Sequence, residues 1–229
     1  MYKYRHELKY VINSNQAIIL KQRLALYMSL DNYQYYKDGS YYIKSLYFDD
    51  IDNSSYYEKI DGMLYRTKYR IRTYNNSLKK IYLERKMKHN NLTSKDKELI
   101  SKDIYSKIIS GNIDNIDSEN NSLLNKFLLD MHLKNLKPSV IVGYKRTAYI
   151  YPISNVRITF DENIVSQGFN YDLFIKNATN INVLDENEVV LEVKYDILPK
   201  VISDIIGTIS EVRESVSKFQ RSKEVGGLK

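Results

Sequence analysis

This chain of 229 residues contains no cysteine and no tryptophan, and it has only 3 histidines, 3 prolines and 8 glycines. Without cysteine there is no disulfide, no thiolate metal site and no cysteine nucleophile. The scarcity of histidine argues against a histidine-based zinc site. Any metal is therefore expected to be a hard cation held by oxygen, Mg²⁺ or Mn²⁺.

Several common signatures are also missing. Neither G-x-x-x-x-G-K-[ST] nor G-x-G-x-x-G occurs, which excludes the P-loop and Rossmann phosphate sites, and no Ser-His-Asp arrangement is credible. No apolar run approaches the ~20 residues that a membrane span requires. The N-terminus opens into a charged segment without a signal-peptide core, so we expect a cytoplasmic protein.

Positive charge is in excess. Lys and Arg total 35 against 28 Asp and Glu, a formal net charge of +7, which predicts attraction to polyanions such as nucleic acid, polyphosphate, nucleotides or an acidic membrane. The hydrophobic fraction of 43% and the charged fraction of 28% are typical of a soluble globular protein.

One tripeptide pattern occurs three times within runs that read as β-strands: Glu7-Leu8-Lys9, Glu84-Arg85-Lys86 and Glu192-Val193-Lys194. Residues i and i+2 of a strand point to the same face, so each pattern places a carboxylate beside an ammonium group. The neighbouring apolar residues face the other way. The pattern predicts a sheet with one ionic face and one apolar face.

The segment 65–74 is the most basic of these strands. Its even positions form one cationic row of Arg66, Lys68, Arg70 and Arg72. Like charges on one strand face repel, so carboxylates or an anionic ligand must compensate them. A solvated outer face is the simplest alternative, but a phosphate ligand suits the forked guanidinium groups better.

The order of elements predicts an α+β fold in which eight antiparallel strands close into a β-barrel with flanking helices. We expect a single domain over residues 1–222, followed by a loose tail at 223–229. The predicted strands lie at about 2–12, 41–48, 64–74, 79–88, 92–100, 139–151, 155–161 and 189–195. Helices are expected at about 14–28, 53–61, 101–109 and 119–134, and from Pro199 onward, where the last helix either covers a mouth of the barrel or packs on its wall.

Projecting the charged face of each strand inward gives a predicted interior of Arg5, Glu7, Lys9, Arg66, Lys68, Arg70, Arg72, Glu84, Lys86, Lys88, Tyr144, Arg146, Arg157, Thr159, Asp161, Glu192 and Lys194. Cations outnumber carboxylates in this set, so the expected ligand is a chain of phosphates, with the carboxylates holding a divalent metal. Single-stranded nucleic acid is disfavoured, because the aromatic and basic residues of 65–74 fall on opposite faces.

Seven motifs occur in an order and spacing that resemble the VTC domain. This family is the polyphosphate polymerase branch of the triphosphate tunnel metalloenzymes (the CYTH-like superfamily), and the chain resembles its bacterial stand-alone form. The motifs are Arg5-His6-Glu7-Leu8-Lys9-Tyr10, Tyr69-Arg70-Ile71-Arg72, Leu83-Glu84-Arg85-Lys86, Gly143-Tyr144-Lys145-Arg146-Thr147-Ala148, Arg157-Ile158-Thr159-Phe160-Asp161, Leu191-Glu192-Val193-Lys194-Tyr195 and Ser217-Lys218-Phe219.

The resemblance implies an ATP-dependent polymerase that passes the γ-phosphate of ATP to a growing polyphosphate chain inside a basic tunnel, with Mn²⁺ or Mg²⁺. It implies catalytic roles for Arg70, Arg72, Lys86, Arg146 and Lys194, and phosphate binding by Lys9, Arg66, Lys68, Lys88, Tyr144, Arg157 and Lys218. Glu192 would be the metal ligand, with Glu7, Glu84 and Asp161 as weaker candidates. A separate membrane protein partner is a further hypothesis, and a nucleic-acid partner is not expected.

One sequence feature distinguishes this chain from the hydrolytic members of the superfamily that it resembles. Those carry Glu-x-Glu-x-Lys on the first strand, whereas here Arg5 replaces the first acid before Glu7 and Lys9. Losing a carboxylate weakens a second metal site and the activation of water, which favours a polymerase or a binder. A metal-dependent triphosphatase or polyphosphatase and a non-catalytic polyphosphate sensor remain the alternatives.

Overall fold

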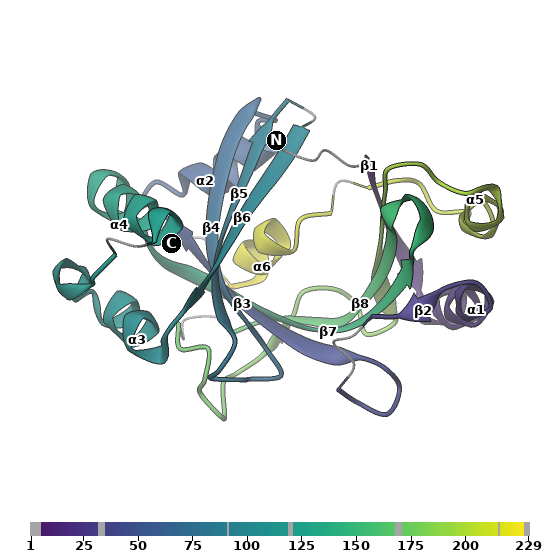
Figure 1. The fold of residues 1–229 in the computed structure, drawn as a ribbon, viewed down its shortest axis with the longest axis horizontal. Coiled ribbons are helices and arrows are strands. Elements are labelled where there is room, and N and C mark those ends of the chain that lie inside the picture. The colour runs from purple at the N-terminus through teal and green to yellow at the C-terminus, as the bar shows by residue number, and fades with distance from the viewer. Residues whose placement is uncertain are drawn as a thin grey trace.

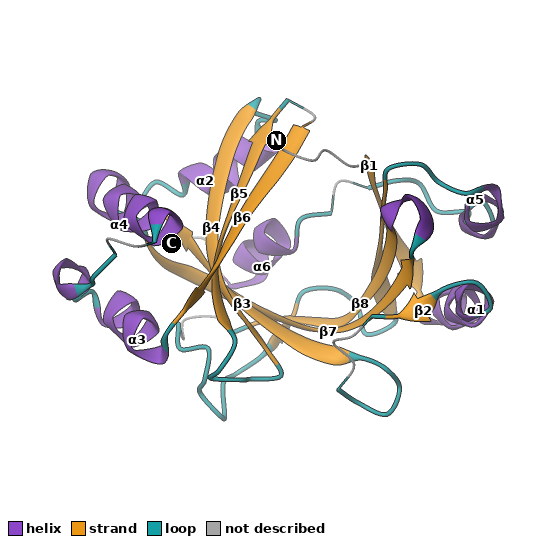
Figure 2. Ribbon diagram, viewed as in Figure 1, coloured by secondary structure: helices purple, strands orange, loops and turns teal. Residues whose placement is uncertain are grey.

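The computed structural model describes residues 6–31, 35–90, 92–118, 121–167, 171–214 and 216–226. Arg5 therefore lies outside the described residues. Within these ranges the chain forms one antiparallel sheet and six α-helices (Figures 1 and 2). None of these helices is both long enough and apolar enough to span a bilayer.

Eight strands follow one another across the sheet. In spatial order they are β1 (His6–Asn13), β10 (Glu188–Tyr195), β8 (Val156–Ser166), β7 (Lys137–Tyr151), β3 (Tyr41–Asp49), β4 (Tyr65–Tyr74), β5 (Ile81–His89) and β6 (Leu92–Ile100). Two short strands that the sequence did not reveal, β2 (Ser29–Leu30) and β9 (Ile181–Asn182), pair with β7 and β8. Pro138, expected to precede its strand, is the second residue of β7, beside a register shift against β3.

The prediction of a closed barrel is wrong for the described residues. β1 and β6 are the two ends of the sheet and do not pair with each other, so the sheet curls into a half-barrel (Figure 1). Closure requires a strand tilt and stagger that bring the first and last strands into register. The alternation of charged and apolar residues predicts which face of a strand is inward, but it does not specify that stagger.

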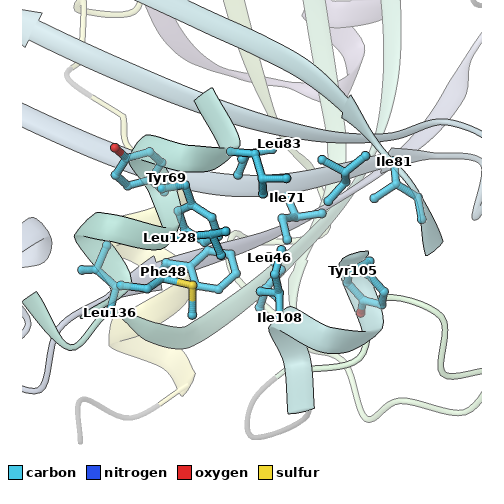
Figure 3. Close-up of a cluster of buried hydrophobic side chains, with 14 of the residues drawn as sticks. Leu46, Phe48, Tyr69, Ile71, Ile81, Leu83, Tyr105, Ile108, Leu128 and Leu136 are labelled. Carbon is cyan, nitrogen blue, oxygen red and sulfur yellow. The ribbon is translucent and has the colours of Figure 1, made fainter. Parts of the chain in front are cut away.

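Four of the six described α-helices cover the two arms of the curl from outside. The bounds are α1 (Ser14–Ala25), α2 (Ser54–Ile60), α3 (Lys102–Ser110), α4 (Ser122–Lys134), α5 (Lys200–Ile206) and α6 (Lys218–Gly226), with 3₁₀ turns at Ile113–Asn115 and Ile153–Asn155. α3 and α4 pack on the outer face of β3 to β6, where Leu46, Ile71 and Leu83 are fully buried (Figure 3). Each such side chain contributes about 2 kcal/mol of hydrophobic free energy, which holds the two helices on the sheet.

α1 and α5 pack together on the other arm, over the outer faces of β1, β10 and β8 (Figure 2). Asn13 rather than the predicted Ser14 is the N-cap of α1, in a capping box with Gln16. The helix after Pro199 therefore lies on the wall of the half-barrel and not at a mouth.

The C-terminal helix is the main correction to the predicted organisation. α6 extends to Gly226 and lies within the curl of the sheet, so residues 223–226 are helical and not loose (Figure 1). Phe219 packs in an inner apolar cluster with Tyr144 and Val142, and the buried Lys223 reaches Asp49. This helix was missed because its few apolar residues are interleaved with polar ones, and its inward face is partly ionic.

Candidate functional site on the inner face

The first and last Glu-x-Lys patterns meet in complementary register. On adjacent strands β1 and β10, Lys9 lies opposite Glu192 and Glu7 lies opposite Lys194. The Nζ of Lys9 is 3.0 Å from Oε1 of Glu7 and 3.6 Å from Oε1 of Glu192, while Lys194 is 3.2 Å from the same Glu192 oxygen. Burial opposes ionisation of Glu192, but Lys194 and Lys9 hold the pKa of its carboxyl well below the usual range.

The second pattern supplies the carboxylate that orients two arginines. Oε2 of Glu84 accepts a 2.6 Å hydrogen bond from Nε of Arg70, and Oε1 accepts a bond of the same length from Nζ of Lys95. Arg72 lies 3.9 Å from Glu84 and donates to Ser45 Oγ at 3.0 Å. Burial would raise the pKa of Glu84, but these cations hold it well below its usual range. The guanidinium groups are thus fixed in one arrangement.

A third carboxylate organises the opposite wall. Asp161 of β8 is fully buried and accepts two hydrogen bonds from Arg146 of β7, at 2.5 and 2.6 Å. Lys218, the first residue of α6, adds an ion pair to Asp161 at 2.6 Å. The α6 helix therefore brings Lys218 to the inner face, while its role in phosphate binding stays a prediction.

Tyr144 lies between these clusters. Its hydroxyl accepts a 3.3 Å hydrogen bond from Nη2 of Arg72, and the charges of Arg146 and Lys218 both lie 5.2 Å from its ring. Such cation–π contacts help to fix the two cations. Tyr144 thus links the Glu84 and Asp161 clusters.

Two arginines that were predicted to bind phosphate instead contact other groups of the protein. Arg66 donates to the backbone carbonyls of Glu58 and Lys59 in the last turn of α2, at 3.4 Å each. Arg157 forms a 2.6 Å ion pair with Asp31, which is 2% exposed, and also donates to Tyr41. Both arginines are therefore engaged with the protein itself.

The remaining lysines of the predicted set lie on β4 and β5. Lys68, Lys86 and Lys88 form no ion pair with any residue in the described ranges. Burial is the main cause that lowers the pKa of Lys68 to about 7 and that of Lys86 to about 8. The charges of Glu7 and Lys9 on β1 also act on Lys86, which indicates that the two arms of the curl face each other.

The carboxylates differ in their fit to a divalent metal. Glu84 and Asp161 each have cations on both oxygens at 2.5 to 2.6 Å, so the structure does not favour them as ligands. Glu192 also has cations near both oxygens, but they lie farther away, at 3.2 to 4.0 Å. Glu7 and Glu192 lie on either side of Lys9, and the buried Thr159 hydroxyl, opposite Glu192, has no hydrogen-bond partner among the described residues. Mg²⁺ or Mn²⁺ commonly uses one or two carboxylates together with substrate phosphates, which these groups fit. No group of three or more acids or histidines with metal-ligand geometry occurs in the described ranges.

The family model of the VTC domain matches residues 4–225. The chain belongs to the VTC domain family. A search of curated proteins found no match.

Solved structures share the fold of this VTC domain. A candidate adenylate cyclase from Bacillus halodurans has a TM-score of 0.57 and 13% identity, covering 96% of this chain and 97% of that one. A candidate adenylyl cyclase from Hippeastrum, with dominant triphosphatase activity, has a TM-score of 0.52 and 14% identity, covering 96% and 95%. At identities of 13% and 14%, these likenesses concern the fold alone.

Several residues of the inner face were missed by sequence reasoning as site residues. Lys95 shares Glu84 with Arg70, Lys223 pairs with Asp49, and Thr159 was placed inside without a role. Lys95 had a visible signal, since it lies on the charged face of a predicted strand. Lys223 had none, because only the position of α6 brings it inward.

Proposed function

We propose that this VTC domain is a polyphosphate polymerase that transfers the γ-phosphate of ATP to a growing inorganic polyphosphate chain. The observation that carries the proposal is the sharing of three inner carboxylates, Glu84, Asp161 and Glu192, by two or more cations each. Glu84 holds Arg70 beside Arg72, Asp161 holds Arg146 beside Lys218, and Glu192 holds Lys9 beside Lys194. This sharing presents ordered cations on the concave face of the sheet.

Such an array suits phosphoryl transfer, in which catalysis is mostly positioning and neutralisation of charge. The terminal oxygen of the phosphate chain attacks the γ-phosphorus, a new P–O bond forms, and the bond to the oxygen bridging the β- and γ-phosphates breaks to release ADP. The attacking oxygen is already ionised near neutral pH, so no protein base is required. Arg70 and Arg72 would orient the triphosphate, while Arg146 and Lys218 would stabilise charge from the opposite wall.

Glu192 and Glu7 would hold the metal ion, Mn²⁺ or Mg²⁺, with the Thr159 hydroxyl beside them. When bound, the ion would neutralise phosphate charge. The predicted membrane protein partner and cytoplasmic location stay predictions.

A second candidate is a metal-dependent triphosphatase. The pair of carboxylates on either side of Lys9 favours it, because a metal held there could also activate water. The Hippeastrum protein, which shares the fold, has triphosphatase activity, but identity of 14% supports the fold alone. Polymerase and triphosphatase would then differ only in the nucleophile.

The test is to incubate the purified protein with ATP and Mn²⁺ or Mg²⁺, and to measure long phosphate chains on a gel together with free phosphate. We expect long phosphate chains to form with little release of free phosphate, and neither product to form once the metal is chelated. Free phosphate without chains would establish the triphosphatase instead. Binding of polyphosphate without either product would leave a non-catalytic sensor.

A further inference from the structure

Past Arg72 the inner face changes from ionic to apolar and aromatic. Arg72 of β4 lies directly opposite Tyr82 of β5, which in turn lies directly opposite Leu99 of β6. Tyr74 follows Arg72 by two residues and is the one tyrosine of β4 on the same face as Arg72. We call Tyr74, Tyr82 and Leu99 the apolar shelf. None of the three is among the residues assigned above to phosphate or to metal.

The rings of the apolar shelf are held in place by other rings. The centroids of the Tyr74 and Tyr82 rings are 6.0 Å apart and their planes cross at 78°, which is an edge-to-face contact. Tyr74 also packs against Tyr41, which is 1% exposed, at a centroid distance of 6.1 Å. The shelf is therefore preorganised, so a ligand that stacks on it loses little free energy in ordering these side chains.

A ligand can reach the apolar shelf. Leu99 is 55% exposed, and Tyr74 and Tyr82 are half-buried. The Nζ atom of Lys97 lies 3.6 Å from the centroid of the Tyr82 ring, and Lys97 is itself exposed. Because an exposed side chain changes rotamer rapidly, a flat ring can take the place of Lys97 on Tyr82.

The shelf adjoins the place where we propose that the triphosphate binds. Residues directly opposite each other on paired strands lie about 5 Å apart, and residues two apart on one strand lie about 7 Å apart. Tyr82 and Tyr74 have these two relations to Arg72. A flat ring that is joined through one sugar to a phosphate at Arg72 therefore reaches the shelf.

The chemistry of the shelf suits a nucleobase better than another phosphate. Its three side chains offer no positive charge to an anion, whereas any base can stack on the face of a tyrosine ring. The ammonium group of Lys97, which also lies 5.6 Å from the Tyr74 ring, can donate to a ring nitrogen or to the nearest phosphate. The shelf and Lys97 together therefore match the base end of a nucleotide.

We propose that the apolar shelf is a nucleobase subsite, in which the base of a nucleoside triphosphate stacks on Tyr82 beside Tyr74 and Leu99. This inference rests on the proposed function and names a determinant of its donor substrate. Arg70 and Arg72 would hold the phosphates of any triphosphate alike, and the shelf then favours a nucleoside triphosphate over an inorganic one.

The experiment compares two ligands of equal charge, of which one has a base. ATP and methyl triphosphate are titrated by calorimetry into the purified protein with divalent metal chelated, so that no phosphoryl transfer takes place. The test variant is Tyr82→Leu, which removes the ring but keeps an apolar side chain at a half-buried position, and Tyr82→Phe keeps the ring. The matched control is Tyr65→Leu, the same substitution on the outer face of β4, where Tyr65 is 68% exposed.

We expect the wild type to bind ATP about tenfold or more tightly than methyl triphosphate. Tyr82→Leu should lose about tenfold in affinity for ATP, and its affinity for methyl triphosphate should change by less than about twofold. Tyr82→Phe should restore most of the affinity for ATP, because the base stacks on the ring and not on the hydroxyl. Tyr65→Leu should match the wild type for both ligands.

The possible failures give different results. If the wild type binds both ligands equally, the nucleobase subsite is refuted without any variant, while the proposed function stands. The subsite is also refuted if Tyr82→Leu weakens both ligands alike or neither, or if Tyr82→Phe binds ATP as weakly as Tyr82→Leu. If the wild type binds neither ligand, the proposed function fails as well.

Discussion

Carboxylates on the inner face act first as organisers of cations. Glu84 is 1% exposed and contacts Arg70, Lys95 and Arg72, and Asp161 is equally enclosed by Arg146 and Lys218. A buried carboxylate with several partners fixes guanidinium groups that would otherwise sample many rotamers. Removal of such a carboxylate leaves buried positive charges without a partner, which destabilises the folded protein.

We predict that Glu84→Gln lowers the free energy of unfolding by about 3 kcal/mol at neutral pH. The pKa of Glu84 is depressed in the folded protein, so its stabilisation is present above the unfolded value of about 4.3 and is lost as pH falls below it. The difference in the free energy of unfolding between Glu84→Gln and the wild type should therefore become smaller from about pH 5 toward pH 3. Denaturant titrations followed by circular dichroism measure it.

The matched control for this prediction is Glu98→Gln, because Glu98 is exposed on β6. Its effect should stay within about 0.5 kcal/mol. An equal effect of the two substitutions would show that Glu84 is not an organising carboxylate.

Lys68 gives a prediction for the pH dependence of binding. Burial lowers its pKa to about 7, so the protonated fraction falls as pH rises from 6 to 8. The charged groups that act on it are Arg66, Lys59, Glu58, Asp49 and, across the strands, Lys86. The ammonium form of Lys68 binds phosphate, so the affinity of the wild type for polyphosphate should weaken as the pH rises from 6 to 8. This loss of affinity should be up to about tenfold larger in the wild type than in Lys68→Met.

Calorimetric titrations at pH 6, 7 and 8 check this prediction, and comparison between the two proteins cancels the ionisation of the phosphate chain itself. Lys126→Met, which removes one charge from an exposed position of α4, is the control and should follow the wild type at every pH. Identical pH profiles for the wild type and Lys68→Met would contradict a role for the Lys68 charge in binding.

At the scale of elements, strands could be predicted and the position of the last helix could not. The alternation of basic and other residues in 65–74, and the Glu-x-Lys patterns, predicted correctly which side chains lie on the inner face of each strand. This was possible because the two-residue period of a strand depends only on local geometry. The roles of Glu84 and Asp161 depend on cross-strand register, which sequence alone did not provide. The inward position of α6 depends on long-range contacts of Phe219 and Lys223, which have no periodic signal.

We predict that Phe219→Ala weakens the docking of α6 by about 3 kcal/mol, because Phe219 is 3% exposed within the inner apolar cluster. The amide hydrogens of α6 should then exchange with deuterium much faster, while those of α4 stay protected. Leu129→Ala, at an exposed position of α4, is the control and should change neither. Unchanged exchange in α6 would mean that Phe219 does not hold the helix.

For the whole molecule, the sequence predicted eight main strands and an inward ionic face but not the open seam between β1 and β6. The protein has a net charge of +7, and the concave face of the curl, which encloses α6 (Figure 1), carries cations that include Arg70, Arg72 and Arg146. A surface of this kind attracts polyanions over long range, and this attraction is screened by salt.

We therefore predict that affinity for polyphosphate falls by at least about tenfold when salt is raised from about 50 mM to about 200 mM, because several ionic contacts form at once. Titrations at constant pH measure the slope of affinity against salt. Affinity independent of salt would contradict binding by the basic inner face.

The most direct test of the central claim is binding of tripolyphosphate to the wild-type protein and to Arg72→Ala. Arg72 lies between Ser45, Tyr144 and Glu84, on the path between the two clusters of cations. The account predicts saturable binding by the wild type and a loss of at least about tenfold in Arg72→Ala, with the fold retained by circular dichroism. Equal affinity of the two proteins would contradict the assignment of the inner face as the triphosphate site.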